Sequence, residues 1–372
     1  MFRNSKESCQ LDVFSNASSF LFGSSLKAYE NSHGWHNLFR EQVTLLIDEE
    51  IFRPLFCQGD GAPNASIRVL VAMMILKESR CWSDAQLFEE CRFNLLVRSA
   101  LFLPNMDDSI PAESTYYLLR RRIVDWEKAG NENLIEKVFA QITQSQAIEF
   151  NVNGKNIRMD SKLIGSNIAW YSRYELIHES LRKAYSYIKP KQEALLLNES
   201  DLNLLESING ESGNKVSYRS SKSEIESRLA ELGTLIYKIV RKMGSHSSEE
   251  IQILCRIFEE QYLENEGVII VRPKEEISAG SIQSPHDPDC HYRDKDGNKI
   301  KGYSINLTET CSTDNSVNLI TNVLVDVVST ADCDFLQPAV EASQEVIVGK
   351  VEKINSDGAF HNVDNQDYCV SR

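Results

Sequence analysis

The sequence predicts an α+β protein of several domains, with an all-helical N-terminal domain and an α/β core that a second group of helices interrupts. Apolar residues recur at helical spacing between residues 35 and 146 and again between residues 176 and 263. Residues 152–169 and 351–360 instead show short strand-like patterns beside glycine and asparagine. We therefore divide the chain into a flexible N-terminal arm (1–34), a helical domain (35–130), a linker helix with the first core strand (131–169), a helical insertion (170–278) and the remainder of the core (279–372).

Composition limits the class of protein further. The apolar content of 42% and the charged content of 25% are ordinary for a globular chain. The sequence has no run of about 18 apolar residues and no apolar N-terminal segment, so we expect neither a membrane partner nor a signal peptide. Nine cysteines without a Cys-x-x-Cys pair indicate reduced thiols and a cytoplasmic location. The net charge of −14 argues against a surface that binds nucleic acid everywhere, but a local basic face remains possible.

The helical domain is predicted from periodicity and capping signals. A helix is expected over residues 35–51, a buried apolar stripe over 67–75, and a further helix after the capping box that begins at Ser83. Ser114 is expected to cap a helix that runs to about Trp126 and carries Arg120, Arg121 and Arg122. Consecutive helical residues point about 100° apart, so the three arginines cannot all contact one DNA groove, and one or two of them at most can contact phosphate. On charge alone, a solvated helix surface is the simpler interpretation.

Two aspartates mark the core. Asn153-Gly154 is a hairpin-turn signal, and the strand after it places Arg158 and Asp160 on one face, opposite Ile157 and Met159. Asp357, followed by glycine, ends a second acidic strand, and between the two lie predicted strands at 303–309 and 319–327 and a helix at 332–346. The apolar run 319–327 predicts a central strand. Two strand-borne carboxylates are suitable oxygen ligands for a pair of Mg²⁺ or Mn²⁺ ions.

Two other features have open interpretations. The insertion reads as an antiparallel, coiled-coil-like helical bundle, which could equally be a dimerisation arm in a homodimer. His286, Cys290 and His291, with Cys311 as the only nearby fourth candidate, suggest zinc by residue type, but their spacing fits no closed four-ligand site. A polar loop is the preferred interpretation of this segment. Asp287 and Asp289 could lie near the metals, although acids beside prolines commonly form turns.

The helical domain resembles a known family. The resemblance lies in four segments in order: Leu70-Val-Ala-Met-Met-Ile-Leu-Lys77, Trp82-Ser-Asp-Ala-Gln-Leu-Phe-Glu-Glu-Cys-Arg-Phe-Asn94, Leu101-Phe-Leu-Pro104 and Ile110-Pro-Ala-Glu-Ser-Thr-Tyr116 with the arginines after it. These segments resemble the InsH-type helical N-terminal domain of bacterial insertion-sequence transposases. The resemblance implies a helix-turn-helix-like region that binds transposon ends. We expect its DNA contacts among Ser114, Thr115 and Arg120–Arg122.

The core resembles the catalytic part of DDE insertion-sequence transposases, and the resemblance covers roughly residues 35–372. It is carried by Arg158-Met-Asp-Ser161, Ile282-Gln-Ser-Pro-His-Asp-Pro-Asp289, Lys301-Gly-Tyr-Ser-Ile-Asn-Leu-Thr-Glu-Thr310, Leu319-Ile-Thr-Asn-Val323 and Ser356-Asp-Gly-Ala-Phe360. The order of elements is that of a ribonuclease-H-like core, in which the first and fourth strands are neighbours. The resemblance implies that Asp160 and Asp357 are the first and second catalytic acids and hold Mg²⁺ or Mn²⁺ in a two-metal site for cleavage and transfer of DNA strands.

The third acid of that family, a glutamate on a later helix, has no counterpart in this sequence. We therefore expect an incomplete, C-terminally truncated core and a chain that alone neither cleaves nor joins DNA. The alternative function is that of a catalytically inactive truncated transposase, acting only as a DNA-binding protein or persisting as an inert remnant. The reading frame downstream of Arg372 would separate these alternatives.

Overall fold

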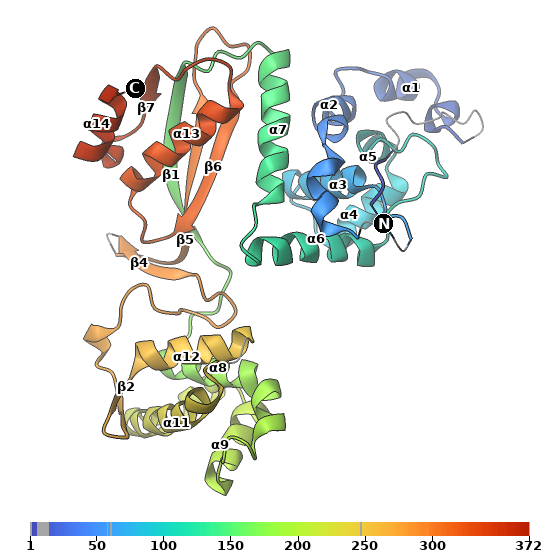
Figure 1. The fold of residues 1–372 in the computed structure, drawn as a ribbon. Helices are drawn as coiled ribbons and strands as arrows, with labels where there is room; N and C mark the ends of the chain where they lie inside the picture. The colour runs from blue at the N-terminus through green and yellow to red at the C-terminus, as the bar shows by residue number, and fades with distance from the viewer. Residues whose placement is uncertain are drawn as a thin grey trace. The chain divides into compact units, whose positions relative to one another are not determined.

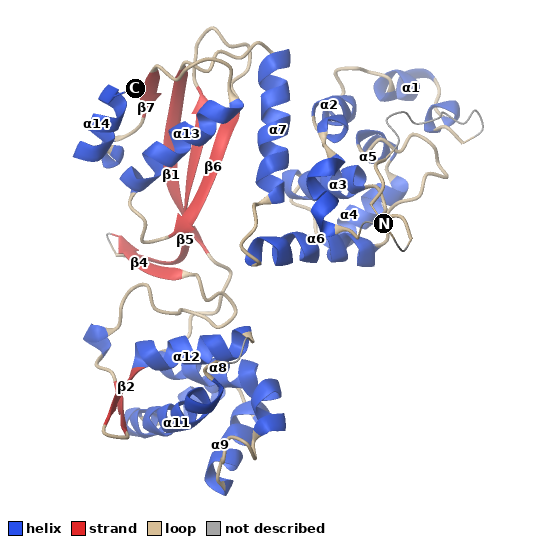
Figure 2. Ribbon diagram, viewed as in Figure 1, coloured by secondary structure: helices blue, strands red, loops and turns tan. Residues whose placement is uncertain are grey.

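The computed structural model describes residues 2–5, 15–57, 59, 62–245, 248–295 and 297–371. Figure 1 traces the chain and Figure 2 distinguishes its helices from its strands. Packing divides the chain into two units. The first contains residues 1–158, 308–322 and 340–355, and the second contains residues 159–307, 323–339 and 356–372. The predicted α+β class is confirmed, because a helical N-terminal region precedes a mixed sheet.

The helices described in the N-terminal region surround one apolar core. Leu70, Met73 and Leu87 are among its fully buried side chains, and Tyr116 packs edge-on against Phe88 at 5.6 Å between ring centroids. Its elements are the 3₁₀ helix η1 (Ala17–Phe20), α1 (Gly23–Tyr29), α2 (Trp35–Gln42), η2 (Thr44–Leu46), η3 (Glu49–Leu55), α3 (Ile67–Ser79), α4 (Asp84–Phe93), α5 (Leu95–Ala100), α6 (Glu113–Lys128) and α7 (Leu134–Glu149).

The capping box at Ser83 is confirmed, since Ser83 and Gln86 exchange side-chain and backbone hydrogen bonds at the start of α4. Two other helix predictions were wrong. The helix at 35–51 ends at Gln42, and the buried Thr44 hydroxyl then donates to the Ala100 carbonyl oxygen at 2.7 Å. Ser114 does not cap α6; the helix begins at Glu113, and its N-cap, two residues before the predicted one, is Ala112, whose side chain cannot accept a hydrogen bond. The predicted flexible arm contains η1 and α1 among its described residues.

The sheet has the strand order β4-β5-β1-β7, and β6 also pairs with β5. The strands are β1 (Asn156–Gly165), β4 (His291–Lys295), β5 (Asn298–Thr310), β6 (Ile320–Val327) and β7 (Lys353–Asn355). β7 runs parallel to β1, and β4 runs antiparallel to β5. The first and last strands of the core are therefore neighbours, as predicted.

β1 and β5 run antiparallel. The Cys311 amide donates to the Asn156 carbonyl oxygen at 2.9 Å, and the Ser166 amide donates to the Lys301 carbonyl oxygen at 2.8 Å. Burial alternates along the first half of β1: Ile157 and Met159 are buried, whereas Arg158 and Asp160 are exposed. The predicted two-faced strand is confirmed.

Two strand predictions need correction. Asn153-Gly154 joins α7 to β1 and makes no hairpin; Gly154 is required because a Cβ there would lie 2.4 Å from the Ile347 side chain. Residues 320–327 form a strand whose sheet partner among the described strands is β5 alone, so β6 is not central. Its valines are partly solvated, and Val325 is 59% exposed. The apolar run therefore reflects strand propensity more than burial.

The insertion has its own apolar core, drawn from residues 174–282, in which Leu181, Ile236 and Ile257 are fully buried. Its elements are α8 (Arg173–Ile188), η4 (Lys189–Lys191), α9 (Glu199–Gly210), α10 (Gly213–Arg219), α11 (Lys222–Met243), α12 (Glu249–Gln261), β2 (Tyr262–Asn265), β3 (Val268–Val271) and η5 (Lys274–Glu276). β2 and β3 form an antiparallel ribbon that the periodicity did not predict.

The remaining elements are η6 (Asp332–Phe335), α13 (Leu336–Val346), η7 (Gly358–Phe360) and α14 (Val363–Ser371). The helix predicted at 332–346 is confirmed, with a 3₁₀ first turn. Among the described residues, no helix combines the length and apolar character needed to span a bilayer.

Candidate functional site

β1 pairs in parallel with β7, and each strand leads toward one of the two predicted catalytic aspartates. The paired residues are Asn156 with Lys353, Ile157 with Ile354, and Arg158 with Asn355. Asp160 lies two residues beyond Arg158 in β1, and Asp357 lies two residues beyond Asn355, the last residue of β7; continued over these two residues, the register would set the two aspartates opposite each other. Neighbouring strands lie about 4.8 Å apart, and paired residues project to the same face. Both aspartates are exposed to solvent. The register thus favours two accessible carboxylates side by side.

Asp357 has a structural role that we did not predict from the sequence. β7 ends at Asn355, and Asp357 continues it in an extended conformation, with φ −77° and ψ 176°. Its carboxylate accepts a hydrogen bond of 2.9 Å from the Ala359 amide and so caps η7. Asp is a preferred helix-capping residue, so the residue type at position 357 could have predicted a cap at this point of the sequence. One carboxylate oxygen is engaged in the cap, which leaves the other for a cation.

Arg158, which precedes Asp160 by two residues in β1, is committed to an ion pair. Its Nε donates to Glu309 Oε1 on β5 at 2.5 Å. This bond and the glutamate's charge raise the pKa of Arg158. Arg158, one of the two cations that flank Asp160 by two residues in β1, therefore already has a carboxylate partner; the other, Lys162, is exposed.

The donor set fits a hard divalent cation incompletely. Asp160 and Asp357 offer carboxylate oxygens, which Mg²⁺ and Mn²⁺ prefer. In the part of the chain that the structure describes, no group of three or more His, Cys, Asp or Glu side chains is placed to hold a metal ion. Mg²⁺ commonly binds through one or two carboxylates and keeps several water or phosphate ligands. Two carboxylates are therefore enough to hold such an ion but not to enclose it.

The residues considered for zinc have other partners. His286 Nε2 lies 3.1 Å from Glu179 Oε1, and His291 Nδ1 lies 3.0 Å from the Ser329 hydroxyl. Cys290 is fully buried, and burial raises the pKa of its thiol to about 11, which disfavours the thiolate that binds metals. The preferred interpretation of this segment, a polar loop, agrees with these contacts.

Asp287, in the same loop, accepts hydrogen bonds from the Ser166 hydroxyl and, at 2.5 Å, from the Tyr303 hydroxyl. Ser166 follows β1 and Tyr303 lies in β5. Asp287 therefore fastens the loop to the two strands, and both of its oxygens accept hydrogen bonds there.

The three arginines of α6 have three different environments. Arg120 lies over the Tyr116 ring at 5.6 Å, Arg121 pairs with Asp125 at 3.5 Å, and Arg122 lies over the Phe56 ring at 5.2 Å. Arg122 and Thr115 line one groove of about 600 Å³ beside the segment 56–65. Ser114, Arg120 and Arg121 do not line it. The helix thus divides the predicted DNA-binding residues between a groove and an open surface, because successive side chains point in different directions.

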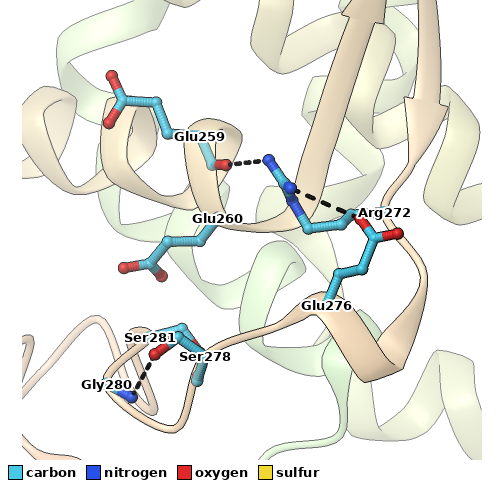
Figure 3. A pocket seen from close by; sticks show the side chains of 7 residues that line it. All are labelled: Glu259, Glu260, Arg272, Glu276, Ser278, Gly280 and Ser281. Atoms are coloured by element: carbon cyan, nitrogen blue, oxygen red, sulfur yellow. Dashed lines mark hydrogen bonds and ion pairs between the residues drawn. The ribbon is translucent and has the colours of Figure 1, made fainter.

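A second cavity, of about 350 Å³, lies in the insertion at the end of α12 and is lined by Glu259, Glu260, Arg272, Glu276, Ser278, Gly280 and Ser281 (Figure 3). Arg272 donates to the Glu259 carbonyl oxygen at 3.0 Å and pairs with Glu276 at 3.7 Å. Glu260 accepts from the Ile282 amide at 2.8 Å and from Arg256 at 2.7 Å. These polar groups hold the segment after β3 against α12, so the cavity has a structural explanation.

Comparison with known proteins supports one class. Residues 28–122 match a family model described as "Transposase domain (DUF772)". The match covers most of the helical domain and supports a transposase, the class that the resemblance predicted. No curated protein matches the chain, and no solved structure matches it.

Proposed function

We propose that this protein is a DDE-type transposase of a bacterial insertion sequence, with a ribonuclease-H-like core. Its helical N-terminal domain would bind transposon ends, and Asp160 and Asp357 would be its metal-binding acids. The observation that carries the proposal is the parallel pairing of β1 with β7, whose register, continued by two residues, would bring these two carboxylates side by side. The family match at residues 28–122 supports the class, and the sequence segments around both aspartates resemble the corresponding parts of that family.

The chemistry follows from the residue types. Asp160 and Asp357 would hold a divalent cation between adjacent strands, with its remaining ligands supplied by water and DNA phosphate. When bound, Mg²⁺ or Mn²⁺ lowers the pKa of coordinated water and stabilises negative charge on a phosphoryl group. The sheet would hold the strands that lead to the two carboxylates, and the hydrogen bond that caps η7 would hold the backbone that carries Asp357. Positioning of this kind is a large part of catalysis in phosphoryl transfer.

Metal binding tests the proposal. Mn²⁺ binding to the purified chain, measured by calorimetry, should weaken about 10-fold or more in Asp160→Asn and in Asp357→Asn. Asp364→Asn is a matched control, because it removes the same charge from α14, seven residues beyond Asp357. Equal Mn²⁺ affinity in the wild type and both active-site variants would refute the carboxylate site.

Strand cleavage is a separate measurement. We expect purified chain to leave DNA that carries the transposon ends intact in the presence of Mn²⁺. The physical reason is that two carboxylates can anchor one metal ion but do not hold a second ion firmly, whereas precise placement of both ions lowers the activation barrier for strand cleavage. Cleavage that disappears in Asp160→Asn would contradict this expectation and would establish activity.

A further inference from the structure

Asn365, in α14, is a buried side chain whose hydrogen bonds join three segments. It is 4% exposed. Its Nδ2 donates to the Phe360 carbonyl oxygen at 2.9 Å and to the Cys333 carbonyl oxygen at 2.8 Å, and its Oδ1 accepts from Gln337 Nε2 at 3.1 Å. Both amide hydrogens and the amide oxygen are therefore used, in an environment where an unmade hydrogen bond is costly.

These bonds reach the backbone that carries Asp357. Phe360 ends η7, the single turn that the Asp357 carboxylate caps, and its fully buried ring anchors that turn. Cys333 lies in η6 and Gln337 lies in the first turn of α13. η7 alone is too short to hold a fixed position, because one turn of 3₁₀ helix has few internal hydrogen bonds. Asn365 connects it to η6, which also packs directly against η7, and to α13.

The start of α14 is arranged to present this side chain. The Asn365 amide donates to Asn362 Oδ1 at 2.7 Å, and the Gln366 amide donates to the Asn362 carbonyl oxygen at 3.1 Å. Asn362 thus caps the N-terminus of α14. The first turn of the helix places Asn365 toward η6 and η7, while Val363 and Asp364 are exposed. Asn365 is the buried residue of α14. The helix is therefore attached through a polar contact and not through an apolar stripe.

We propose that Asn365 is a positioning residue of the carboxylate site: it fixes the turn after β7, and through that turn the Asp357 carboxylate. The role in metal binding rests on the proposed function, whereas the effect on the turn does not. Side chains that orient a metal-binding residue typically change metal affinity 10- to 100-fold when removed.

The experiment compares Asn365→Ala with two controls. Tyr262→Phe removes a buried hydrogen bond to the Leu229 carbonyl oxygen (2.9 Å) in the core of the insertion. Gln337→Ala removes the hydrogen bond that Asn365 Oδ1 accepts and leaves the two that Asn365 Nδ2 donates to η6 and η7. Amide hydrogen exchange, measured without metal, reports the local stability of η7 through the Ala359 N–H, which donates a hydrogen bond to the Asp357 carboxylate. We expect this amide to exchange about 10- to 100-fold faster in Asn365→Ala and at the wild-type rate in both controls.

Mn²⁺ affinity is the second readout. It should fall about 10-fold in Asn365→Ala and remain unchanged in Tyr262→Phe. In the Asp357→Asn background, adding Asn365→Ala should cause no further decrease, because the two changes act through one carboxylate. Reduced stability of Asn365→Ala with unchanged exchange at Ala359 and unchanged Mn²⁺ affinity would overturn the proposal and leave Asn365 as an anchor for α14 only.

The outcomes separate the two proposals. If Mn²⁺ affinity does not depend on Asp160 or Asp357, the proposed function fails, and the exchange of Ala359 still tests the effect of Asn365 on the turn. If Asn365→Ala does not fold, exchange in the wild type under mildly denaturing conditions decides: the amides of Ala359 and Asn365 should open together with one dependence on denaturant. Independent opening of these two amides would refute the inference.

Discussion

Replacing Gly302 with alanine should break the contact between β1 and β5 next to the candidate site. A Cβ at position 302 would lie 2.0 Å from the Ile164 carbonyl oxygen and 2.8 Å from the Ser166 amide nitrogen. Cβ atoms essentially never approach other atoms closer than 3.0 Å, so the strands must separate by about 1 Å. Neither neighbour is the flexible end of a side chain, and rotamer changes therefore cannot relieve the overlap.

The size of the effect follows from the hydrogen bonds at this point. The Ser166 amide donates to the Lys301 carbonyl oxygen at 2.8 Å, and the Val328 amide donates to the Gly302 carbonyl oxygen at 3.2 Å. A shift of about 1 Å takes the first of these out of hydrogen-bonding range. Breaking such bonds and adding the overlap should destabilise this part of the sheet by about 3 kcal/mol.

Amide hydrogen exchange is the suitable assay, because a chain with several cores does not unfold in one two-state transition. Exchange of the Ser166 amide should accelerate about 100-fold in Gly302→Ala, as a local change of about 3 kcal/mol requires. Gly165→Ala is the matched control on the facing strand, since its Cβ would meet only the Lys301 carbonyl oxygen, at an ordinary 3.9 Å. Equal exchange rates in the two variants would refute the argument from close strand approach.

Three further predictions concern the other parts of the chain. Burial lowers the pKa of His178 below 6.5, so the neutral side chain contributes fully to the stability of the insertion at pH values above the unfolded pKa. The free energy of unfolding should therefore decrease as the pH falls below about 6.5, by up to about 1.4 kcal/mol per pH unit. Urea unfolding of His178→Gln should lack that pH dependence. Arg120→Ala with Arg121→Ala should weaken DNA binding and reduce its salt dependence by about one slope unit for each phosphate that the arginines no longer neutralise; an unchanged slope would assign these arginines to surface charge. Deleting the insertion by joining about residue 170 to about residue 279 with a Gly/Ser linker should leave the sheet folded, because the insertion has its own core; circular dichroism that shows no strand content would contradict this.

Local sequence signals were enough for the elements that are specified locally. The helices of the N-terminal domain and of the insertion have apolar residues at the spacing that burial on one side requires, and the capping box at Ser83 formed as its residues predict. The alternation around Asp160 likewise predicted which residues of β1 are buried. Where a residue's own neighbours in the chain supply the interaction, its type and position indicate the outcome.

Other features depended on residues far apart in the chain. The pairing of β7 with β1 joins segments about 200 residues apart, and this pairing brings the strand that precedes Asp357 beside the strand that carries Asp160. Gly154 looked like part of a turn but is required by the Ile347 side chain, and β6 looked central but, among the strands that the structure describes, pairs with β5 alone. Asn365 has an ordinary local sequence, and its importance arises from three partners in η6, η7 and α13. Tertiary structure decided these points because close packing and hydrogen bonding depend on distance in space, which sequence spacing does not determine.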